Sequence, residues 1–394
     1  MKKIGFVAPW YGEKIGGGAE AELRGLVHHL ADAGVALEVL TTCAESFRSD
    51  WGKDFHEPGL TEEAGIPVRR FRTRKPNMNL HEPVNKKLMK GFRVTREEEE
   101  TFCREMINSP DLYEYMKEHG EDYSLFVFIP YMFGTTYYGC QVWPEKSILI
   151  PCLHDEGYAY MRCFREAFSR VKGMIFHAEP ERALAEKLYG AAGEHFPVLG
   201  EGMDTDWTAD AGRFRETTGI REPFLLYAGR KEPGKRVDVL MKYFVRFRQE
   251  WGQDLKLVLI GGGEIANPDP ENILDLGFVD RQVKQDAYAA AAFFCNPSEM
   301  ESFSIVVMES WLAGRPVLVN GKCAVTKDFA IRANAGLYYD NYGEFAGCAR
   351  YLLEHEETAQ AMGKNGGAFV RENFAWEKIV AKYRGYFEQL RIQN

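Results

Sequence analysis

The sequence contains no apolar run of the length that a membrane-spanning helix needs. The longest runs, such as residues 287–295, fall far below the ~20 apolar residues of a spanning segment. The N-terminal residues also lack the unbroken apolar stretch of a signal peptide, because Pro9 and Gly12 interrupt it. We therefore expect a soluble, cytoplasmic protein, with any membrane contact being peripheral and at the inner face.

Paired cysteines and an excess of positive charge are also absent. The eight cysteines form no C-x-x-C pair, and no histidine cluster has the spacing of zinc ligands, so reduced thiols are expected. The chain has 49 Lys and Arg against 58 Asp and Glu, which gives a net charge of −9. A protein of this sign repels a phosphate backbone, which argues against nucleic acid as a partner.

The chain does have enough apolar material for two domains, with 394 residues of which 45% are apolar. Short strand-like runs alternate with helical segments, as in residues 3–8 before 19–30 and residues 223–230 before 237–251. Such alternation predicts an α/β fold of two doubly wound, Rossmann-like domains with parallel sheets. The pattern restarts near Gly202, and the cleft between two such domains is the expected ligand site.

Three consecutive glycines, Gly16 to Gly18, occupy the turn after the first predicted strand. Glycines there let the backbone approach a ligand and leave N–H groups at the start of a helix, which is an anion-binding geometry. The loop is not a dinucleotide fingerprint, because residues 9–15 separate it from the strand. A flexible turn without a ligand is the alternative interpretation.

Charged residues mark the second predicted domain. Arg230 and Lys235 follow its first strand, where open α/β sheets bind ligands, and two cations there suit a diphosphate. Glu301 and Glu309 have seven residues between them, so one lies before and one within a helix expected to begin near Phe303. Free amides at that helix start would suit an anion. Solvated loop cations and ordinary helix charges are the alternative.

His154 ends another predicted strand, at residues 147–154, and is followed by Asp155. A histidine at the edge of a sheet can donate a hydrogen bond to a ligand oxygen or exchange a proton with it. A structural histidine is the alternative.

Residues 69–96 oppose the sign of the whole chain. They hold one acid, Glu82, and ten bases, which leaves nine net positive charges. The segment is either a solvated insertion neutralised by the acidic run 97–100, or a surface for an anionic acceptor or membrane. The bases are Arg69, Arg70, Arg72, Arg74, Lys75, Lys86, Lys87, Lys90, Arg93 and Arg96.

In chain order, these motifs resemble the retaining GT-B glycosyltransferases of family four, also described as group 1. The last helical segment, residues 374–387, is similar to the family's final helix, which crosses back onto the N-terminal domain. The segments that carry the resemblance are GGGAE (16–20), LHD (153–155), GEGMD (200–204), YAGRKEPGK (227–235), IGGGE (260–264), LGFV (276–279) and ESFSIVVME (301–309).

The resemblance implies a nucleoside diphosphate sugar donor held by residues 201–375. The acceptor would be held by residues 1–200, completed by the C-terminal helix 376–394. The implied reaction moves a hexose, from a UDP-sugar first and GDP-mannose next, to a glycan, a glycolipid or a polysaccharide precursor. It would retain the anomeric configuration and require neither a metal nor another cofactor.

By matching position, the resemblance assigns the diphosphate to Arg230 and Lys235, the ribose to Glu309 and the donor sugar to Glu301. His154 would lie near the reacting centre, so that His154, Arg230, Lys235 and Glu301 form the expected catalytic set. The other expected donor-binding residues are Gly17, Gly18, Gly261, Phe278, Val279, Phe303, Ser304 and Ile305.

The chain departs from the family pattern at a few positions. Ser302 and Ser304 stand where the family usually has glycine, Arg236 stands where glycine is frequent, and Glu201-Gly202 replaces an Asn-Gly. These departures concern the identity of the donor more than the activity. Two alternatives stay open on other grounds: a GT-B sugar-nucleotide epimerase or phosphorylase, and a catalytically silent homologue that binds a nucleotide sugar. The basic segment 69–96 argues against an epimerase, which would not need it. The presence of Glu301 and Lys235 argues against a silent homologue.

Overall fold

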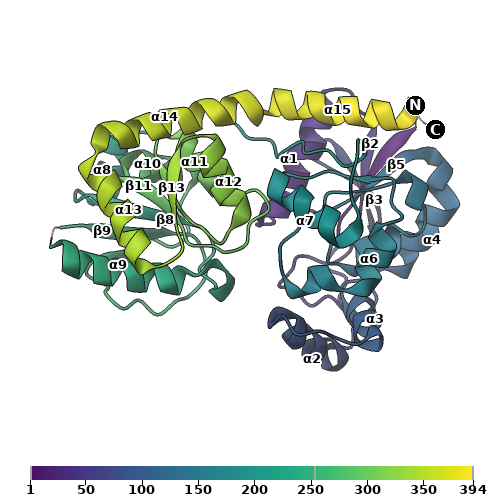
Figure 1. Ribbon diagram of the computed structural model, residues 1–394. Helices are drawn as coiled ribbons and strands as arrows, with labels where there is room; N and C mark the ends of the chain where they lie inside the picture. Colours follow the sequence, from purple (N-terminus) through teal and green to yellow (C-terminus); the bar gives the residue numbers. More distant parts are fainter. Residues whose placement is uncertain (1, 253, 393–394) are drawn as a thin grey trace. The chain divides into compact units, whose positions relative to one another are not determined.

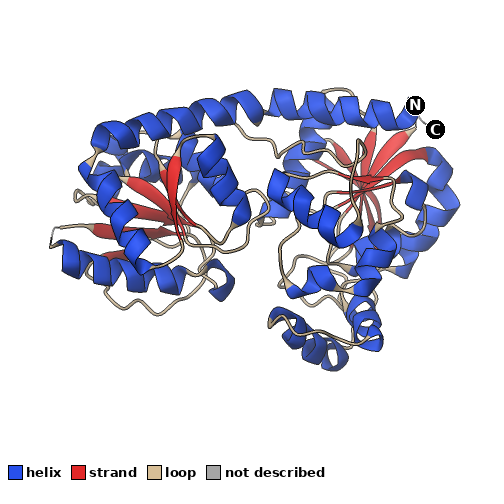
Figure 2. Cartoon of the chain, in the orientation of Figure 1, coloured by secondary structure: helices blue, strands red, loops and turns tan. Residues whose placement is uncertain are grey.

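The computed structural model describes residues 2–252 and 254–392, and the chain divides into two units (Figure 1). The first unit is Met1–Gly202 with Trp376–Asn394, and the second is Met203–Ala375. Each unit has a sheet with helices packed around it (Figure 2). The α/β class predicted from the alternation of apolar segments is confirmed.

The first unit contains a seven-stranded sheet in the order β3-β4-β2-β1-β5-β6-β7. All neighbours are parallel except the β3–β4 pair, which forms an antiparallel edge. The strands are β1 (Lys3–Val7), β2 (Leu37–Thr42), β3 (Gly59–Glu63), β4 (Ile66–Phe71), β5 (Tyr123–Phe128), β6 (Ser147–Leu149) and β7 (Gly173–Met174).

The helices of the first unit include one from the C-terminus, α15, which lies beside α1 (Figure 1). Trp376 anchors α15, because its ring stacks on His29 at 4.3 Å and leaves no space for a side chain at Gly25 or Gly202. The helices are α1 (Gly18–Asp32), α2 (Met78–Met89), α3 (Arg96–Glu105), α4 (Pro110–His119), α5 (Gly134–Gly139), α6 (Arg162–Phe168), α7 (Glu179–Tyr189) and α15 (Trp376–Ile392).

The second unit contains a six-stranded sheet in the order β10-β9-β8-β11-β12-β13, and every neighbouring pair is parallel. Its central strands are buried on both faces, as crossover helices on the two sides of a parallel sheet require. The strands are β8 (Phe224–Ala228), β9 (Lys256–Ile260), β10 (Ile273–Asp275), β11 (Phe293–Asn296), β12 (Val317–Asn320) and β13 (Gly336–Tyr339).

The helices of the second unit connect these strands. α9 has the bounds expected from the sequence, whereas α11 begins at Ile305 and not near Phe303. The helices are α8 (Ala211–Thr218), η4 (Pro233–Lys235), α9 (Val237–Trp251), α10 (Arg281–Ala290), α11 (Ile305–Leu312), α12 (Ala324–Arg332), α13 (Tyr342–Glu354) and α14 (Glu356–Asn373). Within the described residues, no helix of either unit is both long and apolar enough to cross a membrane.

Candidate functional site

The carboxyl ends of β8 and β11 bring together a cation and a carboxylate that are 66 residues apart in sequence. These strands are neighbours in the sheet, so the loops that follow them leave from the same edge. Lys235, at the end of η4, donates from Nζ to Oε1 of Glu301 at 2.9 Å. Both side chains are partly buried, with exposed fractions of 26% and 13%. Lys235, which is expected to bind the phosphate, and Glu301, which is expected to bind the sugar, therefore form one ion pair.

Arg230 lies at the same edge of the sheet but is more exposed. One guanidinium nitrogen lies 3.3 Å from Oε1 of Glu232, and half of the side chain is accessible. Its carbonyl oxygen accepts a hydrogen bond from the buried hydroxyl of Tyr227 at 2.8 Å, which fixes the backbone at the end of β8. The backbone of Arg230 is thus fixed by a hydrogen bond, and its guanidinium group is accessible to an anionic ligand.

The turn before α11 positions the start of this helix. Ser304 has φ 79°, a left-handed conformation, and its Oγ accepts from Nδ2 of Asn296 at 3.0 Å. The first intrahelical bond is donated by the amide of Val307, so the amides of Ser304 and Ile305 precede it. The side chain of Phe303 is buried against Phe374, with ring centroids 4.9 Å apart. The turn is therefore held by packing and presents backbone N–H groups to an anion.

Glu309 lies inside α11 and is almost fully buried. Its Oε1 accepts from Nζ of Lys284 at 2.6 Å, and its Oε2 accepts from the hydroxyl of Tyr288 at 3.0 Å. Burial, together with the nearby charge of Glu309, raises the pKa of Tyr288 well above its usual range, so this hydroxyl stays protonated and donating. A carboxylate has about four lone-pair sites, so the two bonds leave capacity for ligand hydroxyls.

Sequence reasoning did not identify Lys284 and Tyr288 as partners of Glu309. Both lie on α10, and residues 287–295 have the pattern of an apolar run in the sequence. It also missed Lys231, a buried cation whose Nζ donates to the carbonyl of Gly261 at 2.6 Å and to Asp275 at 2.7 Å. Lys231 directly follows Arg230 in the sequence, and this position in the motif could have identified it as a candidate site residue.

Two loops at the ends of β9 and β10 carry the residues expected to meet the base. Gly261 has φ 126°, and a Cβ there would collide with the carbonyl of Gly229, so glycine is required where these chains approach. Phe278 is 90% exposed, whereas Val279 is half-buried. An aromatic ring this exposed near a glycine loop suits stacking on a flat ligand.

Gly17, Gly18 and His154 lie on the first unit. Gly17 has φ 150° at the N-cap of α1, and a Cβ there would collide with the carboxylate of Glu20. His154 follows β6 with a 31% exposed side chain, and its Nδ1 lies 3.6 Å from Oε1 of Glu156. These three residues are accessible enough to meet a ligand. All other predicted site residues lie on the second unit.

Two groups of side chains have donor types that metals use. The expectation of a metal-free reaction rested in part on the absence of an Asp-x-Asp motif, and this was wrong, because the sequence holds one such triplet, Asp204-Thr205-Asp206. Asp204 accepts from a guanidinium nitrogen of Arg281 at 2.8 Å. In the first unit, Glu22, Cys152 and His177 each offer one atom that could coordinate a metal, and these three atoms lie within 4.8 Å of one another.

The basic segment 69–96 is neutralised in part, and mostly by acids outside the run predicted to do so. Lys87 and Arg96 pair with Glu98 and Glu100, as the solvated-insertion interpretation expected. The other acid partners lie elsewhere: Arg69 pairs with Glu38, Arg70 with Glu63, Arg72 with Asp54 and Arg74 with Glu105. Lys75, Lys86, Lys90 and Arg93 are exposed and form no ion pair within residues 2–252 and 254–392.

Residues 210–369 match the family model described as glycosyl transferases group 1. The D-inositol 3-phosphate glycosyltransferase of Kribbella flavida is 30% identical over 227 residues, which are 50% of this chain and 52% of that protein. Glycogen synthase of Thermus thermophilus is 27% identical over 183 residues, which are 45% of this chain and 41% of that protein. The matches span about half the length of these curated relatives.

Solved structures share the fold over the whole chain. Sucrose-phosphate synthase from Thermosynechococcus elongatus has a TM-score of 0.73 at 17% identity, with 100% of both chains covered. HepE from Anabaena in complex with UDP has a TM-score of 0.71 at 16% identity, covering 98% of this chain and 100% of that one. The prediction of a two-domain fold of the GT-B class is thereby confirmed.

Proposed function

We propose, on the premise that residues 210–369 belong to the glycosyl transferases group 1 family, that the chain transfers a hexose from a nucleoside diphosphate sugar to an acceptor hydroxyl. The observation that carries the proposal is the Lys235–Glu301 pair at the carboxyl edge of the β8–β11 sheet. A cation and a carboxylate 2.9 Å apart can bind the phosphate and the sugar hydroxyls on either side of the bond that breaks.

In this proposal, positively charged side chains and backbone amides bind and stabilise the diphosphate leaving group. Arg230 and Lys235 supply two cations, and the amides of Ser304 and Ile305 at the start of α11 supply two neutral donors. The leaving diphosphate gains negative charge as the sugar bond breaks, so these groups stabilise the transition state more than the bound donor. The ribose hydroxyls would bind Glu309, which Lys284 and Tyr288 hold in place.

We favour a UDP-sugar as the donor and GDP-mannose as the second candidate. The similar HepE structures hold UDP and UDP-glucose, and this likeness supports the order of preference. The exposed ring of Phe278 would stack on the base near Gly261 and Val279. His154, Gly17 and Gly18 stay predictions for contacts with the donor.

The proposed reaction retains the anomeric configuration and uses no metal. The departing diphosphate would accept the proton of the attacking hydroxyl on the same face of the sugar, so no separate protein base is needed. The pairing of Asp204 with Arg281 supports a structural role for the Asp-x-Asp triplet. Activity that EDTA abolishes and magnesium restores would overturn the metal-free part of this proposal.

For the acceptor, we propose a lipid-linked or polysaccharide glycan held by the first unit. A cavity of about 750 Å³ lies there, between the loop of residues 47–51 and the start of α2. Aromatic rings, amide side chains and a lysine are the groups that bind sugar rings and anionic substituents. The lining residues are Phe47, Ser49, Asp50, Trp51, Lys75, Pro76, Asn77, Met78, Asn79, His81, Glu82 and Asn85.

Peripheral membrane contact is proposed for α2 and the loop after it. Four cations of segment 69–96 stay exposed and unpaired in the part of the chain that the structure describes, as reported above. Large exposed apolar side chains lie among them, and the combination suits an anionic bilayer surface. These apolar residues are Met78, Leu80, Met89 and Phe92.

A thermal-shift screen with nucleoside diphosphates and their sugars tests the donor assignment. A ligand at 100 times its dissociation constant stabilises the folded state by ~2.7 kcal/mol, which is readily detected. We expect UDP and a UDP-hexose to stabilise the wild type, and the Lys235→Ala variant to respond less. If no nucleotide stabilises the protein, the proposed donor is wrong. If nucleotides bind and no acceptor is glycosylated, the protein is a silent homologue.

A further inference from the structure

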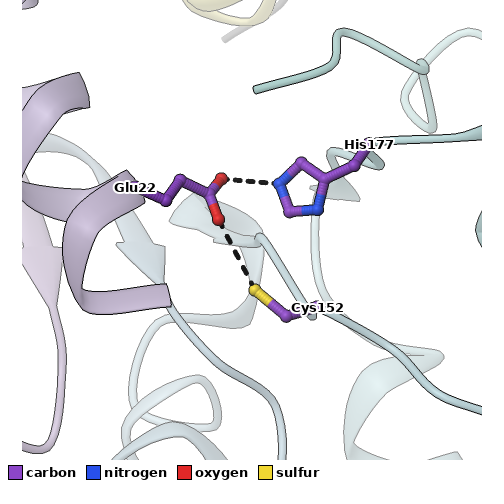
Figure 3. Close-up of side chains that lie close together, drawn as sticks. All are labelled: Glu22, Cys152 and His177. Atoms are coloured by element: carbon purple, nitrogen blue, oxygen red, sulfur yellow. Dashed lines mark hydrogen bonds and ion pairs between the residues drawn. The ribbon is translucent and has the colours of Figure 1, made fainter. Parts of the chain in front are cut away.

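A buried group of polar side chains lies in the first unit and has no role in the reaction proposed above. Glu22 lies on α1, Cys152 follows β6 and His177 follows β7, and Figure 3 shows the three side chains converging. Oε1 of Glu22 lies 2.6 Å from Nε2 of His177, and its Oε2 lies 3.7 Å from Sγ of Cys152. Segments distant in sequence therefore place oxygen, nitrogen and sulfur atoms around one point.

Two more carboxyl groups adjoin this cluster. Glu181 lies 3.7 Å from Nδ1 of His177, and its oxygens accept from the backbone amides of His177 and Leu153 at 2.7 Å each. Glu201 is buried near Glu22 and His177. Three buried carboxyls thus surround one imidazole, and buried acids in excess of bases are costly unless a cation or protons neutralise them.

Acidic groups lie on both sides of the imidazole ring of His177. Oε1 of Glu22 lies 2.6 Å from Nε2, and Oε2 of Glu181 lies 3.7 Å from Nδ1. Carboxyl groups placed in this way attract a cation to the centre of the cluster.

The backbone at Cys152 turns its thiol toward Glu22. Cys152 has φ 51°, a left-handed conformation that costs about 1–2 kcal/mol for a residue with a Cβ. Such strain persists only where the surroundings enforce it, and it is concentrated at functional sites. Here it directs Sγ into the polar cluster.

We propose that Glu22, Cys152 and His177 bind a divalent transition-metal cation of the zinc type, with Glu181 positioning His177 through the hydrogen bond from its backbone amide and through a carboxylate close to its second ring nitrogen. Carboxylate oxygen, thiolate sulfur and imidazole nitrogen are the ligands that Zn²⁺ uses, and a carboxylate behind a ligating histidine is a frequent second partner. Tetrahedral Zn²⁺ places its donor atoms about 3.5 Å apart. Because the three donor atoms already lie within 4.8 Å of one another, small side-chain movements complete the site.

The charges and protons balance on binding. The Cys152 thiol and the His177 imidazolium each release one proton to solvent, and the dication replaces the two positive charges that leave. A water molecule supplies the fourth ligand. Cys152 is two residues from His154, so the bound metal would hold the loop after β6 that carries this residue. The site does not depend on the proposed transferase activity.

Titration of the metal-free full-length protein with Co²⁺ and Zn²⁺ tests the proposal. Thiolate-bound Co²⁺ has a charge-transfer absorption in the near ultraviolet, so we expect this band at one Co²⁺ per chain and its loss when Zn²⁺ is added. Cys152→Ser should abolish the band, and Glu181→Gln should weaken metal binding by ~10- to 100-fold. Cys348→Ser, a half-buried cysteine of the second unit, is the matched control and should change neither.

Thiol alkylation of the wild type, read by mass spectrometry, gives an answer even if the variants fold poorly. Zn²⁺ should protect Cys152 from alkylation and leave Cys348 reactive. The proposal is wrong if the wild type binds no stoichiometric metal, if the absorption band is absent, or if Cys152 stays as reactive with Zn²⁺ as without it.

Discussion

Arg236 and Ser304, two residues of the second unit, hold left-handed backbone conformations with φ of 57° and 79°. Both positions are usually or often glycine in the family that the sequence resembles, and the structure gives the physical reason. Glycine adopts positive φ without the clash that a Cβ produces. The two departures therefore preserve the backbone path, and the hydrogen bond from Asn296 to Ser304 helps to hold one of them.

Substitution of Ser304 tests this backbone interpretation. Ser304→Ala and Ser304→Gly both remove the hydrogen bond from Asn296, but only glycine removes the strain at φ 79°. We expect the glycine variant to have the larger free energy of unfolding, by about 1–2 kcal/mol, measured by urea denaturation. Equal stabilities would mean that the left-handed conformation carries no cost at this position.

The two cations after β8 are expected to act on turnover. Arg230→Ala and Lys235→Ala should each lower kcat by ~10² to 10³, because they meet charge that develops on the leaving diphosphate. Lys242→Ala on α9 is a matched control, since this lysine is exposed and pairs only with Asp238 among the described residues. Steady-state kinetics with a saturating donor separate these cases, and near-normal turnover in the Arg230/Lys235 double variant would reject the assignment.

Glu309 and Glu301 are expected to differ in what they bind. Glu309→Ala should weaken the nucleoside diphosphate and its sugars alike, by about 1.5–3 kcal/mol, because a carboxylate contact to the ribose is lost. Glu301→Ala should weaken only ligands that carry the sugar. Calorimetry with the free nucleoside diphosphate distinguishes them, and equal losses of affinity in both variants would contradict this division.

Sequence reasoning identified charges at motif positions better than it identified their partners. Lys235 and Glu301 were singled out separately, and the contact between them was not predicted. Lys284 and Tyr288 could not be assigned as partners of Glu309, because hydrogen bonds between residues distant in the sequence leave no periodic signal. The proposed metal cluster was missed for the same reason, since its three residues come from separate segments.

At the scale of elements, the pattern of apolar residues located helices better than it located their first turns. α9 spans Val237–Trp251 as expected, because apolar residues recur on one face. α11 starts two residues later than expected, because Ser304 is left-handed and interrupts the helix before Ile305. α2 and α3 were interpreted only as a charged segment, since their charges obscure the apolar positions that pack inward.

The exposed face of α2 and its following loop should bind anionic membranes. The triple reversal Lys86→Glu, Lys90→Glu and Arg93→Glu should reduce sedimentation with phosphatidylserine vesicles, because each base near the surface contributes ~1 kcal/mol. The same reversals at the exposed residues Lys242, Arg246 and Arg350 of the second unit provide a control. Unchanged sedimentation of the α2 variant at low salt would show that the segment is only a solvated surface.

At the scale of the whole molecule, alternating strand and helix segments were sufficient to predict two α/β sheets. The antiparallel β3–β4 edge of the first sheet was not predicted. The return of α15 to the first unit was inferred only through the resemblance to a known family. The position of α15 is held by Trp376, whose ring stacks on His29 and packs against Gly25 and Gly202. These residues are distant in sequence, so no local pattern predicts their contact.

The central claim is transfer of a hexose with retention at the anomeric carbon, and NMR of the product tests it most directly. With a nucleoside diphosphate hexose of known anomeric configuration and a glycan acceptor, the anomeric proton coupling reports the configuration of the new bond. We expect the same configuration as in the donor, because in the proposed reaction the acceptor attacks on the face from which the diphosphate leaves. An inverted anomeric centre would contradict it.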